Sequence, residues 1–98
     1  MNDKQYFVYI LTNKRHTVLY VGFTSDLIGR IENHKCKIVK GFTNKYNINK
    51  LVYFEVIEDY NTALAREKQI KNWHREWKWG LVKKKNPDLK DLTKIINS

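Results

Sequence analysis

Three short runs of this chain are dominated by apolar side chains, and polar segments separate them. The runs cover residues 6–11, 18–23 and 50–57, and they are rich in the aromatic and β-branched residues that favour strands. The polar residues 12–17 join the first two runs and suit a hairpin loop. Alternation along the first run places one set of side chains on each face: Phe7, Tyr9 and Leu11 against Tyr6, Val8 and Ile10. The pattern predicts an antiparallel hairpin and then a third strand with the same strict alternation.

The spacing of an amphipathic helix follows the second run. Thr24-Ser25-Asp26 is an N-cap signal, so a helix is expected over about residues 27–37. Leu27, Ile28 and Ile31 are expected on its buried face.

A longer helix is predicted after the third run. Asn61 or Thr62 is expected to cap it, and it extends to about Trp73 or beyond. Its apolar stripe consists of Ala63, Ile70, Trp73 and Trp77, and Glu67 lies at the edge of that stripe. Further helical segments are expected near residues 79–82 and over residues 86–96. This order of elements predicts an α+β fold, in which helices pack on a small antiparallel sheet.

Length and composition fit one domain spanning residues 1–98. The 98 residues are 42% hydrophobic and 30% charged, which is enough for a single modest core and unlike a disordered chain. No apolar run is long enough to cross a bilayer, and the N-terminal residues have no signal-peptide pattern. Cys36 is the only cysteine and cannot form an internal disulfide. We therefore expect a cytoplasmic location and no membrane partner.

The charge of the chain is strongly positive and unevenly distributed. Nineteen Lys and Arg against ten Asp and Glu give a formal charge of +9. No acidic residue lies between Asn33 and Phe54, a segment with five lysines, and only Glu76 opposes the basic residues from Lys71 to Lys85. Basic surfaces of this kind attract polyanions through counterion release, which favours nucleic acid as the partner over an anionic membrane.

Several side chains have the chemistry that phosphodiester hydrolysis needs. Arg30 can stabilise negative charge on the phosphorane, and Glu67 is a hard-oxygen ligand for one Mg²⁺ or Mn²⁺ that keeps most of its waters. Tyr9 and Tyr20 offer phenols, and the imidazole of His34 titrates near neutrality. Each group also has a structural alternative: strand tyrosines usually pack in a core, and the charged groups usually lie on solvated helix faces.

The arrangement of these groups resembles a known signature. Val8-Tyr9-Ile10 followed by Tyr20-Val21-Gly22 is similar to the paired motif of the GIY-YIG nuclease superfamily, in which a short helix carrying an Arg and often a His four residues later comes next. Arg30 and His34 match that helix, and residues 65–71 place Glu67 at the metal-binding position of the small single-domain, UPF0213-like branch. The resemblance, which extends to the N-terminal domain of an excision-repair nuclease, covers about residues 4–92.

The sequence departs from the family pattern at two positions. Val8 stands where the signature has its first glycine, and Gly29 stands where relatives often have a basic residue.

The resemblance implies a central three-stranded antiparallel sheet flanked by helices, and metal-dependent hydrolysis of DNA phosphodiesters in DNA repair or recombination. Tyr9 or Tyr20 would orient or deprotonate the attacking water, Arg30 would stabilise the phosphorane, and Glu67 would hold a single Mg²⁺ or Mn²⁺. His34, also expected to be catalytic, and Tyr46 would contact phosphate or relay a proton. The expected substrate-binding lysines, which would follow the DNA backbone, are Lys35, Lys37 and Lys45.

Two alternatives remain beside this interpretation. The first is a non-catalytic nucleic-acid-binding module on the same scaffold, although a pure binder has no need for a lone carboxylate in its basic face. The second is a protein–protein adaptor whose basic surface is incidental. No base-reading element is recognisable, so sequence specificity is expected to be low or to be supplied by a protein partner.

Overall fold

The protein is built around a three-stranded antiparallel sheet, as predicted. The structure, a computed structural model, describes residues 5–35 and 47–96. The strands are β1 (Tyr6–Thr12), β2 (Leu19–Thr24) and β3 (Lys50–Ile57), and β1 lies between the other two. Both pairings of β1 are antiparallel. One long side of the sheet is therefore formed by β2 and the other by β3.

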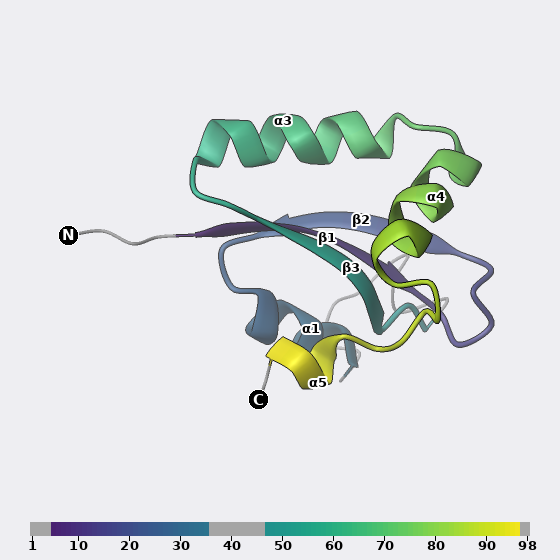
Figure 1. The fold of residues 1–98 in the computed structure, drawn as a ribbon. Helices are drawn as coiled ribbons and strands as arrows, with labels where there is room; N and C mark the ends of the chain where they lie inside the picture. Colours follow the sequence, from purple (N-terminus) through teal and green to yellow (C-terminus); the bar gives the residue numbers. More distant parts are fainter. Residues whose placement is uncertain (1–4, 36–46, 97–98) are drawn as a thin grey trace.

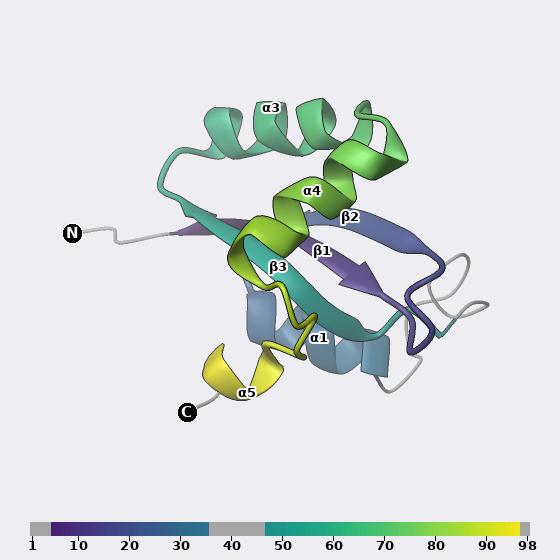
Figure 2. The ribbon, with the colours of Figure 1, turned by 45° about the vertical axis from the view of Figure 1, so that its right-hand side comes forward.

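Helices cover both faces of the sheet. They are α1 (Leu27–Lys35), α3 (Tyr60–Lys71), α4 (Arg75–Lys85) and the short α5 (Thr93–Ile96). Figures 1 and 2 show α3 and α4 on one face, and α1 with α5 on the other. None of the helices in the described part of the chain has the length and apolar character needed to cross a membrane. The α+β fold class is confirmed.

The two faces of the sheet pack into separate parts of the core. Val8 and Ile10 of β1 pack with residues of α3 and α4, whereas Tyr9 and Leu11 pack against α1. The predicted alternation of β1 is therefore confirmed, but the strict alternation expected in β3 is wrong. A β-bulge lies opposite Ile10 and Leu11, so that both Val52 and Tyr53 face the α3 side.

Helix boundaries differ from the expectation in three places. The cap of α3 is Asp59, whose carboxylate accepts a hydrogen bond of 2.8 Å from the backbone N–H of Thr62. The helix ends at Lys71, so Trp77 belongs to α4 and is 59% exposed rather than part of the buried stripe. Residues 86–92 are not helical, because the buried Asn86 side chain donates to the carbonyl oxygens of Val52 and Lys90.

The predicted buried face of α1 is partly wrong as well. Leu27 and Ile31 are buried, whereas Ile28 is 41% exposed. The expected end of this helix near residue 37 lies outside the described residues.

A charged network holds α3 onto β3. The Arg66 guanidinium donates three hydrogen bonds to the Glu55 carboxylate, and the Tyr53 hydroxyl donates to the same carboxylate. Burial alone would raise the pKa of Glu55, but the hydrogen bonds from Arg66 and Tyr53 and the charges of Arg66 and Lys85 outweigh it and leave the pKa below its usual range. The network fixes α3, and therefore Glu67, relative to the sheet.

This network predicts a pH-dependent contribution to stability. A carboxyl group whose pKa is lowered on folding stabilises the protein above its unfolded-state pKa, here about 4.5, and loses that contribution as the pH falls through the folded-state value. At pH 7, Arg66→Ala should lower the free energy of unfolding by about 1–3 kcal/mol, because the half-buried carboxylate loses its partner.

Urea denaturation at several pH values would measure the effect. We expect the stability difference between wild type and Arg66→Ala to shrink as the pH falls below 4.5, while the exposed Lys68→Ala control stays close to wild type. A difference that does not change with pH would contradict this account of Glu55.

Candidate active site

Tyr9 reaches across the neighbouring strand because the residue opposite it is glycine. Tyr9 pairs with Gly22 in the β1–β2 ladder, and a Cβ atom at position 22 would lie only 2.3 Å from both Cζ and Oη of Tyr9. No real side chain could share that space with the phenol. Because Gly22 has no side chain, it leaves an opening over β2, and the end of the Tyr9 side chain extends through this opening toward the edge of the sheet. Tyr9 itself is only 1% exposed.

Tyr20 lies beside Tyr9 on the same face of the sheet. It precedes Gly22 by two residues on β2, and the ring centroids of Tyr9 and Tyr20 are 6.3 Å apart with an interplanar angle of 38°. Tyr20 is half-buried and packs partly against the α1 side of the core. The two signature tyrosines thus form a tilted pair at the β2 edge.

Arg30 is brought to this edge by the start of α1. The Asp26 carboxylate accepts a hydrogen bond of 3.1 Å from the Gly29 N–H, which caps the helix. A Cβ atom at Gly29 would lie 2.3 Å from an Asp26 carboxylate oxygen, so glycine allows this cap to form so tightly. Arg30 follows directly and is exposed.

Glu67 comes from α3, on the opposite face of the sheet. Its side chain is only 14% exposed, and its carboxylate pairs with the Lys71 ammonium one turn later at 3.1 Å. The carboxylate therefore lies at the edge of the buried stripe, and it has a cationic neighbour on its own helix.

Charged and polar groups from three elements influence the pKa of Tyr9. Burial raises the pKa of Tyr9 most strongly, and Tyr20 and Glu67 raise it further, while the Arg30 guanidinium lowers it. Three groups from β2, α1 and α3 thus act on one phenol. The net direction is upward, so Tyr9 holds its proton at neutral pH and can donate a hydrogen bond.

The donor set of this region suits a divalent ion that keeps most of its water. Within residues 5–35 and 47–96, no group of three or more His, Cys, Asp or Glu side chains is arranged to enclose a metal. A single carboxylate such as Glu67 fits Mg²⁺, which dehydrates reluctantly and is often held by one or two carboxylates plus substrate phosphate. An ion at Glu67 would have to compete with Lys71.

Several expected site residues cannot be placed in this arrangement. Tyr46, Lys37 and Lys45 lie outside the described residues. The backbone of His34 and Lys35 is part of α1, and their side chains are also outside the described part. The structure thus brings together Tyr9, Tyr20, Arg30 and Glu67, called the β2-edge site below.

Sequence reasoning missed how Gly22 serves the site. A glycine inside a strand signals a bulge or a close approach of another group, and that signal was present in the sequence. The group that approaches Gly22 is the Tyr9 ring, which could be identified only from the pairing of the strands.

Comparison with known proteins agrees with the fold and with the signature. The chain matches the GIY-YIG catalytic domain over residues 5–81 and belongs to this nuclease domain family. It is 36% identical over 91 residues to a UPF0213 protein of Clostridium perfringens, covering 93% of this chain and 97% of the relative. It is 35% identical over 82 residues to a UPF0213 protein of Haloquadratum walsbyi, covering 84% and 90%.

A solved structure extends the similarity to three dimensions. The solution NMR structure of a UPF0213 protein from Bacillus halodurans is 28% identical and superposes with a TM-score of 0.58. The match covers 92% of this chain and 95% of that one.

Proposed function

We propose that this protein is a metal-dependent DNA endonuclease that hydrolyses phosphodiester bonds at the β2-edge site. The observation that carries the proposal is the environment of the Tyr9 phenol. Its ring end occupies the space left by the missing side chain of Gly22 and lies beside Tyr20. The charges of Arg30 and Glu67 both influence its pKa. A tyrosine that only packs in the core does not need a glycine opposite it on the next strand together with a nearby cation and a nearby anion. Membership of a nuclease domain family supports the same chemistry.

Each residue of the site has a role that follows from its environment. Tyr9, which keeps its proton, and Tyr20 beside it would orient the attacking water through their hydroxyl groups. Arg30 would bind two oxygens of the scissile phosphate and stabilise the charge that develops there. Glu67 would hold the divalent ion, which supplies charge neutralisation at the phosphate when bound. His34 and Tyr46 would contact phosphate or relay a proton, and Lys35, Lys37 and Lys45 would bind along the DNA backbone.

A cleavage screen tests the proposed function. Duplex, single-stranded, flap and four-way-junction DNA would be incubated with Mg²⁺ or Mn²⁺, with EDTA as the control. We expect cutting of at least one substrate with either ion and none with EDTA. Salt-dependent binding without any cutting would overturn the proposal and identify a non-catalytic nucleic-acid-binding module instead.

The ion pair of Glu67 gives a prediction about metal affinity. Lys71 competes for the carboxylate at 3.1 Å, so Lys71→Ala should lower the Mg²⁺ concentration needed for half-maximal nicking. The expected change is about two- to fivefold, since a partly exposed pair of this kind contributes under about 1 kcal/mol. Lys68→Ala, which removes an exposed lysine from the same helix, is the matched control. Equal Mg²⁺ dependence in all three proteins would show that Lys71 does not compete with the ion.

A further inference from the structure

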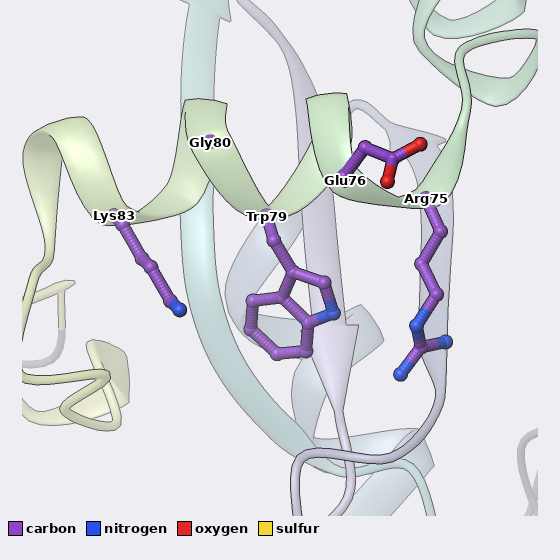
Figure 3. A pocket seen from close by; sticks show the side chains of 5 residues that line it. All are labelled: Arg75, Glu76, Trp79, Gly80 and Lys83. Atoms are coloured by element: carbon purple, nitrogen blue, oxygen red, sulfur yellow. The ribbon is translucent and has the colours of Figure 1, made fainter.

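A hollow on the outer side of α4 combines an aromatic surface with cations on both sides. It has a volume of about 490 Å³ and is lined by Arg75, Glu76, Trp79, Gly80 and Lys83. Figure 3 shows Arg75, Trp79 and Lys83 projecting from the same side of the helix, as expected for residues four positions apart. None of these residues belongs to the β2-edge site.

The rim of the hollow is held by the hairpin that precedes β2. One N–H of the Arg75 guanidinium donates to the Thr17 carbonyl oxygen at 2.7 Å, and the His16 ring packs edge-on against the Trp79 indole with centroids 6.3 Å apart. Trp79 is half-buried and packs partly against the core, which restrains its indole. The aromatic surface and the nearest cation are therefore pre-oriented.

Gly80 has no structural reason to be glycine. It lies in the interior of α4, where glycine is less favourable than alanine, and a Cβ atom there would meet no atom of the described residues within 4 Å. Gly22 and Gly29, by contrast, are required by contacts with Tyr9 and Asp26. A helix position that lines a hollow and lacks a side chain suits the close approach of a ligand.

From these features we propose that the hollow binds one unpaired nucleotide of a DNA strand. The base stacks on Trp79 above Gly80, and Arg75 and Lys83 bind the phosphates on either side of it. The Glu76 carboxylate, the one anion among the lining residues named above, accepts a hydrogen bond from an N–H on the Watson–Crick edge of the base, which pairing would occupy in a duplex. A bare phosphate would gain nothing from the indole and would be repelled by Glu76.

The choice of DNA rests on the proposed function. The inference therefore specifies the substrate class of the proposed nuclease. It would act on DNA in which a single-stranded part extends from the β2-edge site to α4.

Binding measured without cleavage tests the inference. Wild type and variants in EDTA would be titrated with a labelled unstructured DNA oligonucleotide, a blunt duplex of the same length and an RNA of the same sequence. Trp79→Leu keeps the apolar packing but removes the stacking surface, so single-strand affinity should fall about tenfold, with a smaller loss for duplex. Trp77→Leu removes the exposed tryptophan outside the hollow and should bind like wild type.

Gly80→Ala keeps the test decisive even if Trp79→Leu folds poorly. This variant should melt at a higher temperature than wild type, because alanine is the better helix former, yet bind the single strand several-fold more weakly. Stability and affinity would then change in opposite directions, which general damage to the fold cannot produce.

Three results would overturn the inference: wild-type affinity in both Trp79→Leu and Gly80→Ala, equal losses for single strand and duplex, or tighter binding of RNA than DNA in the hollow. The outcome is separate from that of the proposed function. Single-strand binding that depends on Trp79, without any cutting in Mg²⁺, would leave the inference intact and overturn only the nuclease assignment.

Discussion

Glu67→Gln and Arg30→Ala should each reduce nicking of plasmid DNA in Mg²⁺ by about a hundred- to a thousandfold while leaving the fold intact. Glutamine keeps the shape of Glu67 but removes the charge that an ion requires. Alanine at position 30 removes the guanidinium whose charge acts on the Tyr9 phenol. Neither change creates a large cavity, because Arg30 is exposed and glutamine is nearly isosteric with glutamate. The initial rate of conversion of supercoiled to open-circular plasmid measures the loss.

Matched controls separate the site from general charge effects. Arg15→Ala removes an exposed arginine of the hairpin loop, and Glu58→Gln neutralises an exposed glutamate after β3. Both should nick at close to the wild-type rate, and all four variants should keep the circular dichroism spectrum of wild type. Wild-type nicking by Glu67→Gln and Arg30→Ala would refute the roles proposed for these residues.

Gly22→Ala should damage both stability and activity. The added methyl group would occupy space 2.3 Å from the Tyr9 Cζ and Oη atoms, so the ring must move or the strands must separate. Overpacking of this kind typically costs about 1–3 kcal/mol. A displacement of about 1 Å at a reacting group lowers rates by about a hundredfold, and we expect a loss of nicking of that order.

A second substitution separates the loss of activity caused by moving Tyr9 from the loss caused by lower stability. In Tyr9→Leu/Gly22→Ala the shorter side chain leaves room for the methyl group, so the double variant should regain most of the stability lost by Gly22→Ala but none of the activity. Gly80→Ala, where a methyl group meets no other atom in the described part of the chain, should instead gain about 1 kcal/mol of stability. If Gly22→Ala melts like wild type and remains active, Tyr9 does not depend on this opening.

The fold was largely predictable because its strands have strong patterns. The positions of the three strands and the two faces of β1 followed from apolar runs and alternation. The β-bulge in β3 did not, because Val52 is as apolar as its neighbours and only pairing with β1 reveals the extra residue. The cap of α3 was misassigned because Asp59, Asn61 and Thr62 are all good capping residues within four positions.

The candidate site could be predicted only in part. Periodicity places Tyr9 on a face and Arg30 on a helix, but it cannot bring β1, β2, α1 and α3 to one edge of a sheet. The resemblance to the GIY-YIG signature supplied that grouping in advance. The opening at Gly22 and the ion pair of Glu67 with Lys71 depend on atomic contacts between elements or along a helix turn, so they emerged only with the structure.

The ion pair of Glu67 and Lys71 also implies that folding does not depend on a bound metal ion. In a zinc finger the free energy of metal binding drives folding, so the apoprotein is unfolded. Here the carboxylate already has an internal counterion, so a chelator should leave the melting curve unchanged. On the proposed function, we expect the protein to stay folded without an ion and to bind one when a polyanion draws both Lys71 and the metal toward its phosphates.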